Sequence, residues 1–191
     1  MEAKSHWEAI YQQQSTDLSW YAPHLDVSLA MLGRAGMSRE SRVIDVGAGA
    51  STLVDDLLEQ GIAHLTVLDI SREALGVSQA RLGDRAQRVH WIETDLTEGT
   101  LASHAYDLWH DRACFHFLTT DEQRLRYLTT MREALASGGQ VILATFSLKA
   151  PPRCSGLAVT RYSAEMLQQE LPGFTLVEAC EEAHRTPFHT V

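Results

Sequence analysis

The sequence predicts an α/β fold, in which a mostly parallel sheet carries helices on both of its faces. Three observations support this prediction. Short β-rich runs alternate with stretches of helical periodicity along most of the chain. A glycine turn joins the first central run to the helix after it, an arrangement typical of doubly wound sheets. No internal repeat or low-complexity segment interrupts the alternation.

The predicted strands are apolar and rich in β-branched residues. In chain order they cover residues 42–46, 65–70, 89–92, 106–109, 140–146 and 174–181. No further β-rich run follows residues 174–181, so the sequence predicts a sheet of six strands or one with a poorly ordered sixth strand. An open sheet edge favours pairing with another chain, and we therefore predict a possible homodimer through that edge.

The helices are predicted from apolar spacing and from capping residues. Ser71 caps the helix after the second strand, and Ser163 caps a short helix near the end of the chain. Asp121 opens a longer helix that Gly138-Gly139 ends. One face of that helix should carry the apolar residues Leu125, Leu128, Met131 and Leu135. An aromatic N-terminal segment and a helix near residues 26–35 precede the sheet.

Composition places the chain among single-domain globular proteins and disfavours several classes. The chain has 191 residues and a net charge of −9, with its arginines scattered. A nucleic-acid or anionic-membrane partner would require a basic face, so neither partner is expected. No signal peptide, membrane-spanning run or paired cysteine spacing is found in the sequence. We therefore expect a cytoplasmic protein.

The central motif is the glycine turn Asp45-Val46-Gly47-Ala48-Gly49, followed by Ser51. Glycines permit a tight turn and a close approach of the backbone to a ligand. A dinucleotide cofactor is one reading, but the third glycine of its motif is Thr52 here, and Asp45 would repel a pyrophosphate. S-adenosylmethionine carries positive ammonium and sulfonium groups, which suit an acidic turn. A turn without any ligand is the plain alternative.

Two further acids follow the next two strands. Asp69 ends the second strand, where a carboxylate can accept hydrogen bonds from both ribose hydroxyls. Asp95 follows the third strand, where it can accept from the exocyclic amine of adenine. Each acid alone could be a helix-start or loop residue. Three acids at the carboxyl ends of three successive strands favour a nucleoside cofactor with positive charge.

With these motifs the chain resembles the class I S-adenosylmethionine-dependent methyltransferases, which have a Rossmann-like fold. The likeness covers about residues 40–147. Members of this family normally end with an antiparallel seventh strand beside the sixth, so the resemblance implies that this strand is missing here or that the sequence is truncated. It implies that Asp45, Gly47, Ala48, Gly49 and Ser51 line the methionine and ribose end of S-adenosylmethionine. It also implies that Asp69 and Ile70 hold the ribose, and that Asp95 and Leu96 hold the adenine. By the same resemblance residues 1–38 form a lid segment, residues 40–147 the cofactor-binding core and residues 148–191 a segment on the substrate side.

The stretch after the fourth predicted strand should face the methyl acceptor, as it does in similar small methyltransferases. Asp111 is predicted to contact cofactor or acceptor, and Arg112 to clamp an anionic substrate. His116 could be a general base, or a histidine satisfied inside the pocket wall. His110, Cys114 and His116 match no familiar zinc spacing, so no metal is expected. Trp20 could cover the sulfonium or simply pack on the sheet.

The expected function is methyl transfer from S-adenosylmethionine to a small molecule by in-line displacement. The chain carries no obvious added recognition domain and no basic docking face. Methylation of a protein lysine is the first alternative, because compact relatives do this with a similar core. A non-catalytic protein that binds S-adenosylmethionine is the second alternative. The fold alone does not name the acceptor.

Overall fold

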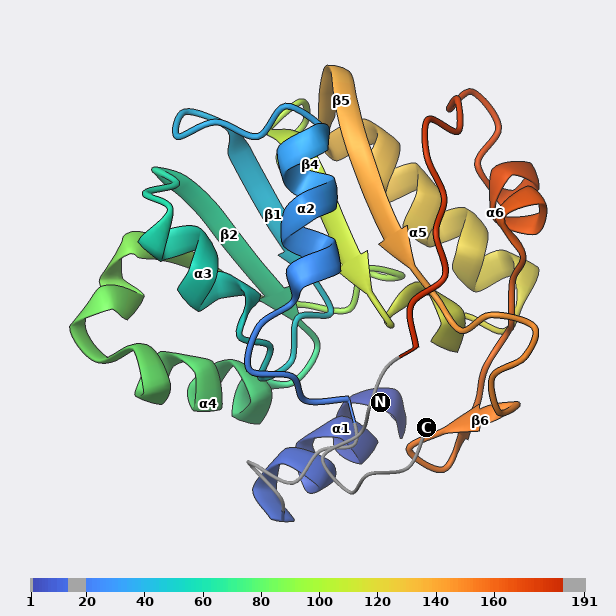
Figure 1. Cartoon of the computed structure of the whole chain (residues 1–191). Helices are drawn as coiled ribbons and strands as arrows, with labels where there is room; N and C mark the ends of the chain where they lie inside the picture. Colours follow the sequence, from blue (N-terminus) through green and yellow to red (C-terminus); the bar gives the residue numbers. More distant parts are fainter. Residues whose placement is uncertain (1, 14–19, 184–191) are drawn as a thin grey trace.

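The computed structural model describes residues 2–13 and 20–183 of the chain. Its centre is a parallel sheet of five strands in the order β3-β2-β1-β4-β5. The strands are β1 (Arg42–Val46), β2 (His64–Asp69), β3 (Val89–Glu93), β4 (Tyr106–Arg112) and β5 (Leu135–Ala144). The helices are α1 (Glu2–Gln13), α2 (Asp26–Arg34), α3 (Leu53–Glu59), α4 (Arg72–Leu82), α5 (Asp121–Ala134) and α6 (Ala164–Glu170). The predicted α/β fold class is confirmed (Figure 1).

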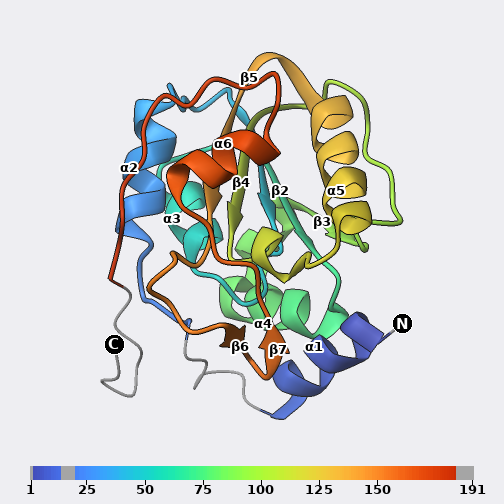
Figure 2. The same ribbon diagram turned by 90° about the vertical axis from the view of Figure 1, so that its right-hand side faces the viewer.

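Helices cover both faces of the sheet, as Figure 2 shows for α2 and α3 on one side and α5 on the other. Successive side chains of a strand point to opposite faces. In β1, Val43 therefore packs into the core shared with α2 and α3, whereas Ile44 and Val46 pack into the core shared with α5. Strands buried on both faces are almost wholly apolar, so a polar residue inside one of them is unusual.

The predicted helix starts are confirmed by their caps. The Ser71 hydroxyl accepts a hydrogen bond from the Ala74 N–H at the start of α4, and Ser163 caps α6 in the same way through the Met166 N–H. Thr120 and Gln123 form a reciprocal capping box at the start of α5. These local signals lie within four residues of sequence, which is why they could be read directly.

The junction between α5 and β5 differs from the prediction. The helix ends at Ala134 and β5 begins at Leu135, so Gly138-Gly139 lies inside the strand and does not end the helix. The pairing with β4 is irregular in this stretch, and Gly138 adopts a positive φ of 77°. A bulge of this kind takes up extra residues at the start of a strand. Leu125 is 63% exposed, so it does not belong to the buried face that Leu128 and Met131 form.

The predicted sixth strand is wrong for the described part of the chain. Residues 174–183 form no strand, and Leu176 and Val177 are 50% and 84% exposed. Ion pairs from Arg34 to Glu178 and from Lys149 to Glu181 hold this segment instead. A β-rich run becomes a strand only where a partner strand accepts its hydrogen bonds, and no strand of the described sheet pairs with residues 174–183.

Two segments lie across the carboxyl ends of the strands. Helix α1 crosses below the arrowheads in Figure 1, and a short antiparallel hairpin of β6 (Arg153–Cys154) and β7 (Leu157–Ala158) lies beside it. The hairpin belongs to the long loop that the sequence predicts after β5. Among the described residues, no helix is long and apolar enough to span a bilayer. Ligands of open parallel sheets bind at the carboxyl ends of the strands, so the candidate site is expected there.

Candidate functional site

A cavity of about 2290 Å³ opens at the carboxyl ends of the strands and continues along β5 to residues 174–183. Most of the residues predicted to bind a cofactor or acceptor line it: Trp20, Asp45, Gly47, Ala48, Ser51, Asp69, Ile70, Asp95, Leu96 and Arg112. Gly49, Asp111 and His116 are not among the lining residues. The volume exceeds the roughly 300–1,000 Å³ typical of ligand pockets because the cavity extends beyond the strand ends to residues 174–183.

The glycine turn after β1 has the conformation that glycine favours. Gly47 and Gly49 have φ values of 59° and 56°, in the left-handed region that a side chain strains. A Cβ atom on Gly47 would overlap the side chain of Cys114, and one on Gly49 would overlap the hydroxyl of Tyr11. Both glycines are therefore required by local geometry, and the backbone between them is left accessible to a ligand.

Asp69 closes the turn from the end of β2. Its two carboxylate oxygens accept backbone hydrogen bonds from Gly49 (2.7 Å) and Ser71 (2.8 Å). Burial is the main cause that raises the pKa of this carboxyl group to about 6, although the backbone hydrogen bonds oppose the shift. Each carboxylate oxygen keeps a second lone pair. Asp69 can therefore orient the glycine turn and still accept hydrogen bonds from a diol.

Asp95 lies at the cavity edge after β3. Its Oδ1 accepts hydrogen bonds from the backbone N–H of Thr97 (2.8 Å) and from the Thr97 hydroxyl (2.7 Å), an arrangement typical of an Asx turn. The carboxylate is half-buried, and Leu96 beside it is buried. The three strand-end acids Asp45, Asp69 and Asp95 therefore line one cavity, as the sequence predicts.

Asp45 makes a contact that the sequence analysis missed. Its Oδ1 lies 2.7 Å from Nδ1 of His110, and Nε2 of His110 lies 2.9 Å from the Ser28 hydroxyl. The other oxygen of Asp45, Oδ2, is buried and has no hydrogen-bond partner among the described residues. The alternation of side chains along β1 and β4 was the available signal, because it places Asp45 and His110 on the same face.

Asp111 lies on the opposite face of β4 from His110. Its oxygens accept hydrogen bonds from the Tyr127 hydroxyl (2.6 Å) and from the backbone N–H groups of Cys114 (2.9 Å) and Phe115 (3.1 Å). Burial raises the pKa of this carboxyl group to about 6. These contacts indicate that Asp111 holds the short turn after β4. Its predicted contact with cofactor or acceptor stays a prediction.

His116 is fully buried in that turn, between the rings of Phe117 and Phe146. Its Nδ1 accepts a hydrogen bond from the Phe146 backbone N–H (3.3 Å), which leaves the proton on Nε2. Burial lowers the pKa of His116 to about 4, so the ring is neutral near pH 7. The only basic nitrogen is occupied, and the geometry favours the pocket-wall alternative over the general base.

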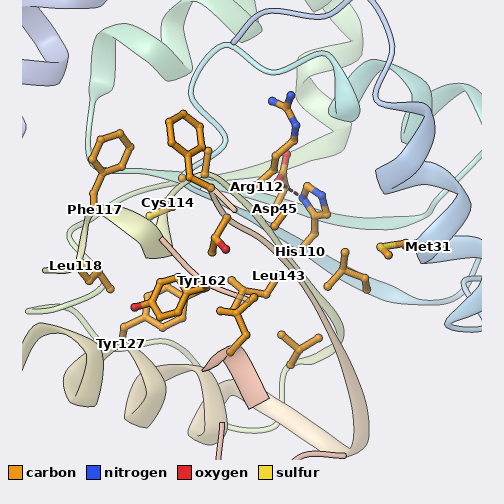
Figure 3. A pocket seen from close by; sticks show the side chains of 18 of the residues that line it. Met31, Asp45, His110, Arg112, Cys114, Phe117, Leu118, Tyr127, Leu143 and Tyr162 are labelled. Atoms are coloured by element: carbon orange, nitrogen blue, oxygen red, sulfur yellow. Dashed lines mark hydrogen bonds and ion pairs between the residues drawn. The ribbon is translucent and has the colours of Figure 1, made fainter. Parts of the chain in front are cut away.

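Arg112 and Trp20 meet at the mouth of the cavity. The Arg112 guanidinium donates a hydrogen bond to the Trp20 carbonyl (3.3 Å), and burial lowers its pKa. Figure 3 shows Arg112 beside Asp45 and His110, with Cys114, Phe117 and Tyr162 around the neighbouring part of the cavity. Burial raises the pKa of the Cys114 thiol well above its usual value, so this group is a poor nucleophile at neutral pH.

The site contains more aromatic side chains than the sequence predicts. Tyr11 and Trp7 of α1 pack edge-to-face on Trp20, and Trp7 packs in the same way on Phe117. All four rings line the cavity. Helical spacing places Trp7 and Tyr11 on one face of α1, which was the signal that could have indicated their position.

Among the described residues, no group of three or more potential metal-ligating side chains comes together.

Known proteins of similar sequence are methyltransferases. The eEF1A lysine and N-terminal methyltransferase of Mus musculus is 23% identical over 138 residues, which are 72% of this chain and 19% of that protein. The ubiquinone biosynthesis O-methyltransferase of Dechloromonas aromatica is 25% identical over 171 residues, which are 90% of this chain and 66% of that protein. The chain thus spans about a fifth of the mouse relative and about two thirds of the bacterial one.

Solved structures and family models agree with this result. An S-adenosylmethionine-dependent methyltransferase from Mesorhizobium loti superposes with a TM-score of 0.63 at 19% identity, over 78% of this chain and 79% of that one. A family model described as a methyltransferase domain matches residues 43–139, which is just over half of the chain. The predicted resemblance is thereby confirmed, and the chain belongs to the methyltransferase domain family, with the fold of the S-adenosylmethionine-dependent methyltransferases.

Proposed function

We propose that this protein transfers a methyl group from S-adenosylmethionine to a small-molecule acceptor. The observation that carries the proposal is the set of strand-end acids around the glycine turn. Asp45, Asp69 and Asp95 line one cavity, two of them are buried, and Oδ2 of Asp45 has no hydrogen-bond partner among residues 2–13 and 20–183. A cofactor with an ammonium group, a sulfonium group and a ribose diol offers cationic groups and donors for these oxygens.

Each chemical group of such a cofactor has a matching residue in the cavity. The turn that contains Gly47 and Gly49 would lie beside the methionine part, because glycines carry no side chain that blocks its approach. Asp69 would accept from the ribose hydroxyls, with Ile70 beside it, and Asp95 and Leu96 would hold the adenine. When bound, S-adenosylmethionine supplies a methyl group on a positively charged sulfur, which is a good leaving group. The protein then has to bind the cofactor and the acceptor, orient them toward each other and exclude water.

The covered cavity supports a small-molecule acceptor. Trp7 and Tyr11 of α1 line it from one side, and hairpin residues such as Cys154 and Leu157 line it from another. Leu118, Phe146 and Tyr162 add further apolar and aromatic surface. Sites for small ligands are concave and mostly apolar, with few polar groups. The 90% coverage by a ubiquinone biosynthesis O-methyltransferase is consistent with this class.

Arg112 is the candidate contact for an anionic group of the acceptor. It lines the cavity beside Asp45, and a guanidinium binds carboxylate or phosphate with two parallel hydrogen bonds. A general base is not needed for an acceptor that is already a nucleophile at neutral pH. In this proposal the described parts of residues 1–38 cover the cofactor, with Trp20 close to it, and residues 148–183 border the acceptor. Residues 1, 14–19 and 184–191 of the two predicted segments lie outside the described residues.

Methylation of a protein lysine is the second candidate, favoured by the similarity to the eEF1A lysine and N-terminal methyltransferase. A non-catalytic cofactor-binding protein is the third. The net charge of −9 supports the expectation that nucleic acid and membranes are not partners. The predicted homodimer through an open sheet edge belongs to the same proposal, and β5 is one of the two edge strands of the described sheet. The cytoplasmic location is part of the proposal as well.

Calorimetry tests the cofactor assignment. Wild type should bind S-adenosylmethionine and S-adenosylhomocysteine, and Asp69→Ala should bind both at least tenfold more weakly. If wild type binds neither ligand, the proposal fails; if Asp69→Ala binds as tightly as wild type, the ribose assignment fails.

Product formation separates the acceptor classes. Release of S-adenosylhomocysteine should require a small-molecule acceptor from a panel of phenols, thiols and amines. Turnover with basic proteins alone would favour the lysine alternative. Tight binding without turnover on either panel would favour the non-catalytic alternative.

A further inference from the structure

Three buried polar side chains form one continuous chain on the α2 side of the sheet. Ser28 of α2, His110 of β4 and Asp45 of β1 are 6%, 1% and 2% exposed. The Ser28 hydroxyl lies 2.9 Å from Nε2 of His110, and Nδ1 of His110 lies 2.7 Å from Oδ1 of Asp45. Figure 3 shows the contact between His110 and Asp45, with Arg112 beside it.

The sheet itself brings these residues together. Asp45 and His110 are register neighbours on the parallel strands β1 and β4, so their side chains point to the same face. Val43 and Leu108, two residues earlier in each strand, pack on that face against α2 and α3. Asp45 and His110 therefore replace an apolar pair at the cavity end of this core.

The hydrogen-bond pattern fixes the roles of the atoms. An ionised carboxylate only accepts hydrogen bonds, so Nδ1–H of His110 donates to Oδ1 of Asp45. Nε2 then lies beside Ser28, whose hydroxyl can donate to it. Oδ2 of Asp45 is then a buried oxygen without a partner among the described residues. Asp45 is also one of the residues that line the cavity. A buried polar atom without a partner calls for an explanation such as a missing ligand.

The same three residue types activate a serine nucleophile in many hydrolases. That reading does not fit here, because Ser28 is not among the residues that line the cavity. Asp45 and His110 are the two members of this chain that line the cavity. The arrangement therefore brings the carboxyl group of Asp45 to the cavity wall, with His110 and Ser28 hydrogen-bonded in sequence behind it.

We propose that His110, held by Ser28, is a positioning residue that directs Oδ2 of Asp45 toward the ammonium group of the bound cofactor. This inference rests on the proposed function. Asp69 and Asp95 follow β2 and β3, on the side of β1 away from β4, and are assigned to the nucleoside. Asp45 with His110 and Arg112 lies on the β4 side of the turn, where the amino-acid part of the same molecule would extend.

Two ligands separate positioning from a structural role. S-adenosylhomocysteine carries the ammonium group, whereas 5′-methylthioadenosine has the same nucleoside and lacks the amino-acid part. We expect His110→Phe to weaken S-adenosylhomocysteine at least tenfold in calorimetry and to change the affinity for methylthioadenosine less than twofold. His110→Asn, which keeps a donor near the Nδ1 position, should recover most of the loss.

The companion variants keep the test decisive if His110→Phe folds poorly. Ser28→Ala removes only the support for Nε2 and should weaken S-adenosylhomocysteine severalfold, with methylthioadenosine unchanged. In Asp45→Asn, adding His110→Phe should cause no further loss, because His110 acts through Asp45. Equal weakening of both ligands in these variants, or wild-type affinity for S-adenosylhomocysteine in Ser28→Ala and in His110→Phe, would overturn the inference. Failure of wild type to bind either ligand would instead overturn the proposed function.

Discussion

The two faces of β4 use buried polar residues in opposite ways. On the α5 face, Trp109 donates to the Tyr127 hydroxyl, which donates to Asp111, and Asp111 also accepts from the turn after the strand. On the α2 face, His110 is hydrogen-bonded to Asp45, a cavity-lining residue whose Oδ2 is buried and has no partner in the described part of the chain. The α5-face network is closed within the protein and stabilises the turn after β4. The α2-face network ends at a residue that lines the cavity, where a ligand could bind.

Adjacent residues of β4 differ in role because their side chains point to different faces of the sheet. His110, Asp111 and Arg112 were expected to face one acceptor site because they follow one another in sequence. Side chains alternate between the faces of a strand, so only His110 and Arg112 share the face that Asp45 occupies. What distinguishes these two acids is that Asp45 lines the cavity with one oxygen unpartnered among the described residues, whereas Asp111 is not a lining residue and accepts hydrogen bonds from Tyr127 and the turn.

The largest expected effect is the loss of stability in Asp111→Ala. The substitution leaves Tyr127 and two backbone N–H groups without their acceptor, and we expect the free energy of unfolding to fall by about 3 kcal/mol. Urea denaturation measures this loss. Tyr127→Phe should show a smaller loss of about 1.5 kcal/mol. An Asp111→Ala protein as stable as wild type would show that the α5 face is not the structural one.

Asp45→Asn should show the reverse behaviour. The affinity for S-adenosylhomocysteine should fall at least tenfold, because a charge-assisted hydrogen bond to the ammonium group is lost. The free energy of unfolding should change by less than about 1 kcal/mol, since one buried oxygen already lacks a partner. Calorimetry and urea denaturation on the same preparation test both statements. A large loss of stability with unchanged affinity would remove the distinction between the two faces.

Cofactor affinity should depend on pH through Asp69. Its pKa of about 6 lies above the ordinary value for an aspartate, so the folded protein favours the protonated form. Its contribution to stability is fully present below about pH 4 and is lost as pH rises through about 6. Ribose binding uses the ionised form, so the affinity for S-adenosylhomocysteine should fall about tenfold from pH 7 to pH 5.

The matched control for this pH dependence is Asp69→Asn. This variant binds weakly at every pH but lacks the titrating carboxyl group, and its affinity should vary less than threefold over the same range. Calorimetry in buffers of matched ionic strength measures both proteins. An equally steep fall in Asp69→Asn would assign the pH dependence to another group.

The smallest expected effect is that of His116→Gln. The ring is neutral above about pH 5 and its Nδ1 already accepts a backbone hydrogen bond, so turnover at saturating acceptor should fall less than threefold. The pH profile of turnover should keep its shape. A fall of more than a hundredfold, with a lost basic limb, would restore His116 as the general base.

Most of the fold and the frame of the site could be predicted because their signals are local. Caps at Ser71 and Ser163, the glycine turn and the acid at the end of β2 each depend on a few neighbouring residues. The start of β5 at Leu135 was not predicted, because it depends on an irregular pairing with β4. The failure at residues 174–183 has a similar cause, since strand propensity has no effect without a partner strand.

The fold class, the glycine turn and the identity of the three strand-end acids can therefore be read from the sequence. Which polar groups face the cavity depends on the tertiary structure. It placed Asp111 and His116 behind the cavity wall and joined Ser28, His110 and Asp45 across 82 positions of sequence. The physical reason is that hydrogen-bond satisfaction is a property of three-dimensional neighbours, and sequence spacing does not record the partners that strands and helices bring together.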